Sequence, residues 1–110
     1  MPDREERGHV LVVIAREAIG ERFGLAARAR PDEPWLAQPA ATFVTLRLEE
    51  DLRGCIGSLD ARRPLGEDVA ANARAAAFSD PRFGPLTAGE FARVAVEVVH
   101  DGAEGSIVRG

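Results

Sequence analysis

The sequence predicts an α+β fold, with an antiparallel sheet built around a central hairpin and flanked by two main helices. Two stretches with apolar residues at helical spacing, 9–23 and 64–78, predict the helices. Stretches rich in Val, Thr and Leu, two of them separated by a short acidic turn, predict the strands. At 110 residues, the chain is long enough for one domain spanning residues 1–110. We expect residues 1–8 and 101–110 to be flexible or peripheral.

The first predicted helix spans residues 9–23 and ends at Gly24. One side of it is apolar, formed by Leu11, Ile14, Ala15, Ala18 and Ile19. His9 stands at its start, where we expect a solvated side chain. Residues 26–39 contain three prolines and no clear period, which predicts a loop. Within it, Trp35 is expected to anchor on the core, since an indole buries a large apolar area; stacking on a ligand is the alternative.

Three strands are expected. Residues 41–49 place Val44, Leu46 and Leu48 on one face. A polar turn at 49–51 then leads into a second strand, 52–59, which returns beside the first as a hairpin. Residues 93–99 alternate in the same way and predict a third strand.

The second helix is expected over residues 64–78, with Pro64 in its first turn. Asn72 interrupts the apolar face of this helix, so it either fastens a loop backbone or lines a pocket. The segment 79–85 holds two prolines and a glycine, which predicts a compact turn. Asp80 and Arg82 within it either form an ion pair that shapes the loop or reach the cysteine.

The only cysteine, Cys55, lies in the segment 52–57 between two glycines. Alternation along a strand puts Arg53, Cys55 and Gly57 on one face, and Leu52, Gly54 and Ile56 on the other. A nearby guanidinium favours the thiolate, which is the reactive form of cysteine. The glycines either let another backbone pack tightly or leave room for a ligand. Cys55 is therefore either a buried structural residue or a reactive one.

Composition excludes several classes of function. The formal net charge is −4, with acids and arginines interspersed, so no broad basic face is available for nucleic acid. No apolar run is long enough for a membrane span, and the polar start lacks the apolar core of a signal peptide. One cysteine cannot form an internal disulfide, which favours a cytoplasmic location. No paired spacing of metal ligands appears, so neither a metal nor another cofactor is expected.

Four segments of the chain match the pattern of a known family when taken in order. They are residues 42–46, residues 52–57, the helix with Asn72 and Ala73, and residues 80–83. With these segments, the sequence resembles the AMME chromosomal region protein family. Its bacterial and archaeal members are called AmmeMemoRadiSam system protein A. The resemblance covers about residues 8–99 and implies an α+β fold, with Memo-like and radical SAM proteins as partners. Family members continue beyond the third strand, so we expect either a truncated or divergent member, or a sheet edge that pairs with another chain, such as a homodimer.

Two functions use the same residues. As a binding or accessory module, the chain would take a small anionic ligand or a partner surface at Arg53, Gly54, Gly57 and Arg82, with Asn72 and Asp80 nearby. As a cysteine-dependent enzyme, it would use Cys55 as the nucleophile on a small anionic or acyl substrate. The binding function is favoured because neither His9 nor His100 is tied to the cysteine by a sequence pattern. Whether the chain is an enzyme stays open at this point.

Overall fold

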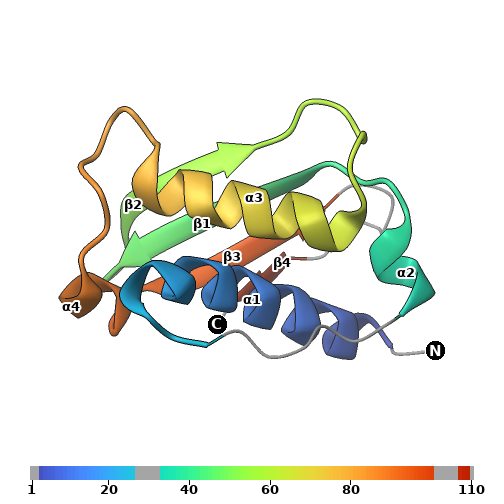
Figure 1. The fold of residues 1–110 in the computed structure, drawn as a ribbon, viewed down its shortest axis with the longest axis horizontal. Helices are drawn as coiled ribbons and strands as arrows, with labels where there is room; N and C mark the ends of the chain where they lie inside the picture. Colours follow the sequence, from blue (N-terminus) through green and yellow to red (C-terminus); the bar gives the residue numbers. More distant parts are fainter. Residues whose placement is uncertain (1–2, 27–32, 101–106, 110) are drawn as a thin grey trace.

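The computed structural model describes residues 3–26, 33–100 and 107–109 (Figure 1). The helices are α1 (Arg4–Gly20), α2 (Pro34–Ala37), α3 (Leu65–Phe78) and α4 (Ala88–Phe91), with a 3₁₀ turn, η1 (Glu21–Phe23), directly after α1. The strands are β1 (Thr42–Leu48), β2 (Asp51–Gly57), β3 (Ala95–His100) and β4 (Ile107–Arg109). The predicted α+β fold class is confirmed.

The strands form one antiparallel sheet in the order β2-β1-β3-β4. Helices α1 and α3 lie side by side on one face of this sheet, α3 against β1 and β2, and α1 against β3 and β4 (Figure 1). The predicted hairpin consists of β1 and β2. Within the sheet, β1 has a neighbour on each side and β2 is an edge strand.

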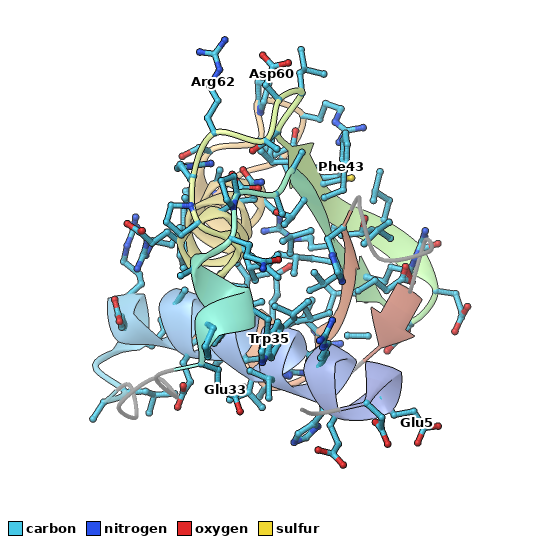
Figure 2. All side chains as sticks on the ribbon, turned by 90° about the vertical axis from the view of Figure 1, so that its right-hand side faces the viewer. Glu5, Glu33, Trp35, Phe43, Asp60 and Arg62 are labelled. Atoms are coloured by element: carbon cyan, nitrogen blue, oxygen red, sulfur yellow. The ribbon has the colours of Figure 1, made fainter. Side chains whose placement is uncertain are left out.

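The core fills the space between the two main helices and the sheet, as the side chains in Figure 2 show. Val44 and Leu46 of β1 and Val96 and Val98 of β3 are at most 1% exposed. The helices oppose them with fully buried residues that include Leu11, Ile19 and Val69. The predicted placement of Val44 and Leu46 on the buried face is confirmed, and Phe43 and Thr45 therefore lie on the face opposite α1 and α3.

Helix α1 begins earlier than the sequence predicted. The Asp3 side chain accepts a hydrogen bond from the Glu6 N–H at 2.9 Å and caps the helix, so that Arg4 already lies in it. The α-helix ends at Gly20 and tightens into η1, and Gly24 follows with φ of 81°, as a C-terminal glycine often does. His9 is exposed on α1, as expected.

Several predicted boundaries are wrong by one or two residues, including the end of the second strand, which lies at Gly57 and not at residue 59. Pro64 lies outside α3, because its backbone (φ −52°, ψ 142°) is not helical. Strand β3 begins at Ala95 and not at Arg93, because the N–H groups of Arg93 and Val94 donate to the Glu90 carbonyl at the end of α4. Helix α4 itself begins with a capping box formed by Thr87 and Glu90.

Part of the predicted loop 26–39 is helical. Pro34–Ala37 form α2, a single turn with Pro34 at its start, where proline is tolerated. This turn buries Trp35, which confirms the predicted anchor, and the indole Nε1 donates to Glu33 Oε2 at 2.6 Å. Positions 27–32 of the predicted loop, and 101–106 and 110 of the predicted peripheral end, lie outside the described residues.

Candidate functional site

Strand β2 carries a β-bulge at Arg53. The register of the hairpin shifts there, so that Leu52 pairs with Arg47 and Arg53 is the extra residue. Bulges re-aim side chains and often lie next to functional sites. The predicted placement of Leu52 on the face opposite Cys55 is wrong, because the partner of Leu52 lies on the same side of β1 as the partner of Cys55, Thr45.

The Arg53 guanidinium is engaged within the chain. Its Nε and Nη2 donate to the two carboxylate oxygens of Glu90, each at 3.0 Å, and Nη2 also donates to the Gly84 carbonyl at 2.9 Å. The guanidinium lowers the pKa of Glu90 to about 2. Arg53 thus fixes α4 and the preceding loop to β2, and only 13% of its side chain is exposed.

The Cys55 side chain is half-buried, and its Sγ lies 3.2 Å from the Thr45 hydroxyl. Its backbone makes two further contacts at the edge of the sheet. The N–H donates to Asp80 Oδ2 at 3.1 Å, and the carbonyl accepts from Arg82 Nη2 at 3.5 Å. Asp80 and Arg82 therefore occupy the positions that the backbone of a further strand would take beside Cys55.

Asp80 and Arg82 are also bound to each other. Nε and Nη2 of Arg82 donate to the two Asp80 oxygens at 3.1 and 2.7 Å, a fork geometry that strengthens an ion pair. These bonds hold the pKa of the Asp80 carboxyl well below its usual range. Between them, Arg53 and Arg82 also hold Phe83, whose ring centroid is 5.7 and 5.4 Å from the two guanidinium carbons.

Gly54 lets another backbone pack tightly, the first of the two alternatives, whereas a side chain covers Gly57. A Cβ at Gly54 would lie 2.1 Å from the Ala76 carbonyl oxygen, so the glycine lets β2 approach α3. A Cβ at Gly57 would lie 2.1 Å from the Phe43 ring. That ring is 46% exposed and lies over Gly57 on the face opposite α1 and α3.

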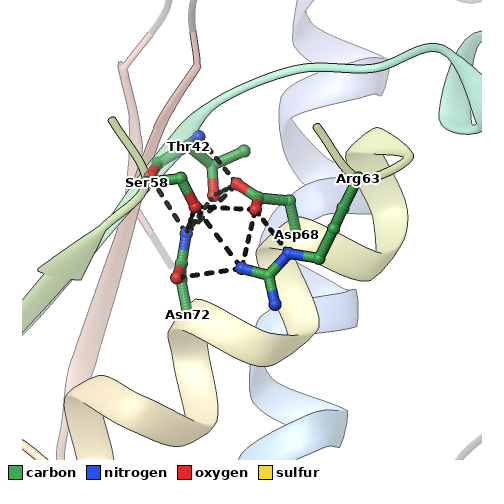
Figure 3. Close-up of polar contacts among 5 residues, drawn as sticks. All are labelled: Thr42, Ser58, Arg63, Asp68 and Asn72. Atoms are coloured by element: carbon green, nitrogen blue, oxygen red, sulfur yellow. Dashed lines mark hydrogen bonds and ion pairs between the residues drawn. The ribbon is translucent and has the colours of Figure 1, made fainter. Parts of the chain in front are cut away.

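Asn72 belongs to a different cluster, at the start of α3 (Figure 3). Its Nδ2 donates to the Thr42 carbonyl at 3.1 Å and to the Ser58 hydroxyl at 3.0 Å. Both groups surround Asp68, which is 1% exposed and accepts hydrogen bonds from Thr42, Ser58 and Arg63. Asn72 therefore fastens backbone, the structural one of its two alternatives, although this backbone belongs to the start of β1 and not to a loop.

The structure thus brings together three of the predicted site residues, Cys55, Asp80 and Arg82, with Arg53 joined to them through Phe83. The sequence reasoning missed Thr45, Glu90 and Asp68. Asp68 precedes Asn72 by four residues and so shares its helix face, which is the signal that could have identified it. In the part of the chain that the structure describes, the Cys55 sulfur has a hydroxyl, and no histidine or carboxylate, as its hydrogen-bond partner.

Two further findings concern other kinds of site. Among the described residues, no group of three or more His, Cys, Asp or Glu side chains could hold a metal ion. None of the described helices has both the length and the apolar character that crossing a membrane requires.

The fold and this site define a two-layer α+β domain whose edge strand is covered by an Asp–Arg pair beside a half-buried thiol. The chain belongs to the AMMECR1 family, whose sequence profile matches residues 12–100. It is 44% identical over 100 residues to Protein SSO0193 of Saccharolobus solfataricus, covering 86% of this chain and 44% of that protein. Protein LS215_2104 of Saccharolobus islandicus is 43% identical over 99 residues, with 84% and 44% covered.

A solved structure has the same fold. The uncharacterized protein PH0010 from Pyrococcus horikoshii superposes with a TM-score of 0.78 at 35% identity, covering 86% of this chain and 51% of that one. The chain therefore spans about half the length of the relatives that it matches.

Proposed function

We propose that this domain is a binding or accessory module that acts in the cytoplasm with Memo-like and radical SAM partner proteins. The surface that we assign to this binding, the Cys55 face, consists of Phe43, Thr45, Cys55 and Gly57 on β1 and β2. The observation that carries the proposal is the Phe43 ring, 46% exposed on the side of the sheet opposite α1 and α3. Exposed aromatic side chains are typical anchors of protein interfaces.

The charged groups around Cys55 also favour binding over catalysis. A cysteine nucleophile requires a base or a free cation beside the sulfur. Here the sulfur contacts the Thr45 hydroxyl, and the two nearby guanidiniums are neutralised by Glu90 and Asp80. Among the residues that the structure describes, the hydrogen-bond partner of the sulfur is a hydroxyl, which is a poor base for the thiol proton.

The test is binding of the full chain to purified Memo-like and radical SAM proteins. Phe43→Ala should weaken the complex by about tenfold or more, because truncation of a central aromatic anchor costs over about 1.4 kcal/mol. Leu25→Ala is the matched control. Leu25 is also an exposed apolar residue (55%), but it follows η1 and is not part of the Cys55 face. Equal affinities for the wild type and Phe43→Ala, or no complex at all, would contradict the proposal.

The alternative, a cysteine-dependent enzyme, is supported by the partial exposure of Cys55 and by the Arg82 guanidinium, whose Nη2 lies 3.5 Å from the Cys55 carbonyl. Its alkylation by iodoacetamide at neutral pH decides between the two. A binding surface predicts a rate no faster than that of glutathione. A rate more than about tenfold faster would indicate an activated thiol and support the enzyme.

A further inference from the structure

An open cleft of about 440 Å³ lies beyond the C-terminal end of β2 and shares no lining residue with the Cys55 face. It is lined by Ser58, Leu59, Asp60, Arg62, Arg63 and Asp68. Asp60 and Arg62 stand together at one end of the molecule (Figure 2). The volume is within the usual range of small-molecule sites, about 300–1,000 Å³.

One of the two arginines in this cleft, Arg63, is held rigidly but retains free donors. Its Nε and Nη2 bind the buried Asp68 carboxylate at 2.9 and 2.8 Å, as Figure 3 shows. Its Nη1 makes no hydrogen bond to any of the described residues, and 46% of the side chain is exposed. The guanidinium is thus oriented in advance, which lowers the entropy cost of binding an anion.

The Asp68 oxygens are not open to the cleft, because other groups of the protein already occupy them. They accept hydrogen bonds from Thr42, Ser58, Arg63 and Asn72, and the residue is 1% exposed. Burial raises the pKa of Asp68, but the hydrogen bonds from Ser58, Thr42 and Arg63 outweigh it and lower the pKa overall, so the carboxylate stays charged and fixes Arg63.

The other arginine can turn toward a ligand. The Arg62 side chain is 81% exposed, and its ion pair with Asp60, at 3.1 Å, is also exposed. Pairs of this kind contribute about 0–1 kcal/mol, so the pair is easily exchanged for another. Leu59 also lines the cleft, is 93% exposed and offers an apolar contact.

The geometry points to a binding site for a small carboxylate that carries an apolar substituent, such as a free branched acid or the C-terminus of a peptide. Arg62 and the Nη1 of Arg63 bind the carboxylate, and Leu59 contacts the substituent. A monoanion fits better than phosphate, because Asp60 and Asp68 offset most of the charge of the two guanidiniums, while the free N–H donors suit the two oxygens of one carboxylate. This site is independent of the Cys55 face.

The test is an NMR titration of the isotope-labelled full chain with isovalerate, isovaleramide, N-acetyl-leucine and inorganic phosphate. Isovalerate should shift the amides of residues 58–63 saturably and bind about tenfold more tightly than the uncharged isovaleramide. Tighter binding of N-acetyl-leucine would identify a peptide C-terminus as the source, and tighter binding of isovalerate a free acid. Equal binding of acid and amide, or tighter binding of phosphate, would overturn the proposal.

Variants separate the site from nonspecific attraction. Arg62→Ala should weaken isovalerate binding by about fivefold or more, and Arg63→Lys should do so by removing the guanidinium fork while keeping the charge. Arg74→Ala is the matched control, because Arg74 is half-exposed on α3 and pairs with Glu21 outside the cleft. An equal loss in Arg74→Ala, or none in Arg62→Ala, would contradict the site. Phe43→Ala should leave isovalerate binding unchanged, which keeps this test separate from that of the Cys55 face.

Discussion

Gly54 allows β2 to pack directly on the backbone of α3. A side chain there would place Cβ 2.1 Å from the Ala76 carbonyl oxygen, which belongs to a rigid helix and cannot rotate away. We expect Gly54→Ala to lower the free energy of unfolding by about 1–3 kcal/mol or more, the range for overpacked interiors. Urea unfolding of the variant and the wild type measures this difference.

Gly89→Ala is the matched control for that measurement. Nothing lies within 4 Å of a Cβ built at Gly89, and the residue is in α4. Alanine there should leave the free energy of unfolding unchanged or raise it by about 1 kcal/mol at most. If both variants unfolded at the same urea concentration, close packing would not be the role of Gly54.

Single residues also mark what the sequence can and cannot predict about the site. Asn72 stands out because an amide interrupts an apolar helix face. Asp68 stands out only because it shares the helix face of Asn72, since an acid in the first turn of a helix is already explained by the helix dipole. Its burial depends on the arrival of Thr42 and Ser58 from two strand ends, and a local pattern carries no information on that meeting.

At the scale of elements, the segment from α3 to α4 is attached to β2 by charged groups. Asp80 and Arg82 bind the Cys55 backbone, and Arg53 binds Glu90. The sequence predicts that residues 79–85 turn, because prolines and a glycine restrict them. The sequence left open whether Asp80 and Arg82 pair with each other or reach the cysteine, and the structure shows both contacts. The Arg53–Glu90 contact could not be predicted, because Arg53 lies at the bulge, where the regular alternation of the strand ends.

This attachment makes stability depend on pH. The pKa of Glu90 is about 2 in the folded state, against 4.5 as its ordinary value, so folding favours the ionised carboxylate. Its contribution is therefore complete above the ordinary pKa and is lost as the pH falls from about 5 toward about 2. Asp80, whose pKa is also lowered, adds to the loss in the same direction.

Glu90→Gln isolates this contribution. The variant should be less stable than the wild type at neutral pH. The difference should shrink as the pH falls below about 4, because the unfolded wild type then binds a proton at Glu90 that the folded state does not, which lowers the stability of the wild type alone. Urea midpoints across a pH series give both quantities. Glu67→Gln, at an exposed position of α3, is the control and should shift the midpoints little. A constant difference at every pH would contradict the role assigned to the Arg53–Glu90 pair.

At the scale of the whole molecule, the sequence predicts which residues are buried better than it predicts their partners. The alternation in β1 identifies Val44 and Leu46 as core residues, and both helix faces are also readable from their spacing. The position of β2 at an edge could not be predicted, since apolar periodicity does not distinguish an edge hairpin from a central one. The placement of α1 and α3 on the same face likewise depends on how the connections run.

Because α1, α3, β1 and β3 share one core, we expect the domain to unfold in a single transition. Leu46 lies in that core with no exposed surface, so Leu46→Ala should lower the free energy of unfolding by about 2–5 kcal/mol. Trp35 is the only tryptophan and is buried on α2, so its fluorescence reports the docking of that segment, while circular dichroism reports the helices. In both the wild type and Leu46→Ala, the two signals should change at the same urea concentration.

The control is Leu59→Ala, at a leucine that is 93% exposed, which should change stability by no more than about 0.5 kcal/mol. Leu46→Ala could also lower the urea midpoint of the circular dichroism transition and leave that of the Trp35 fluorescence transition unchanged. This result would mean that α2 docks independently of the sheet. The α1–α3 layer and the sheet would then not share one cooperative core with the segment around Trp35. Coincident transitions, displaced together by Leu46→Ala and not by Leu59→Ala, are the expected result, because the same buried side chains join every element of the fold.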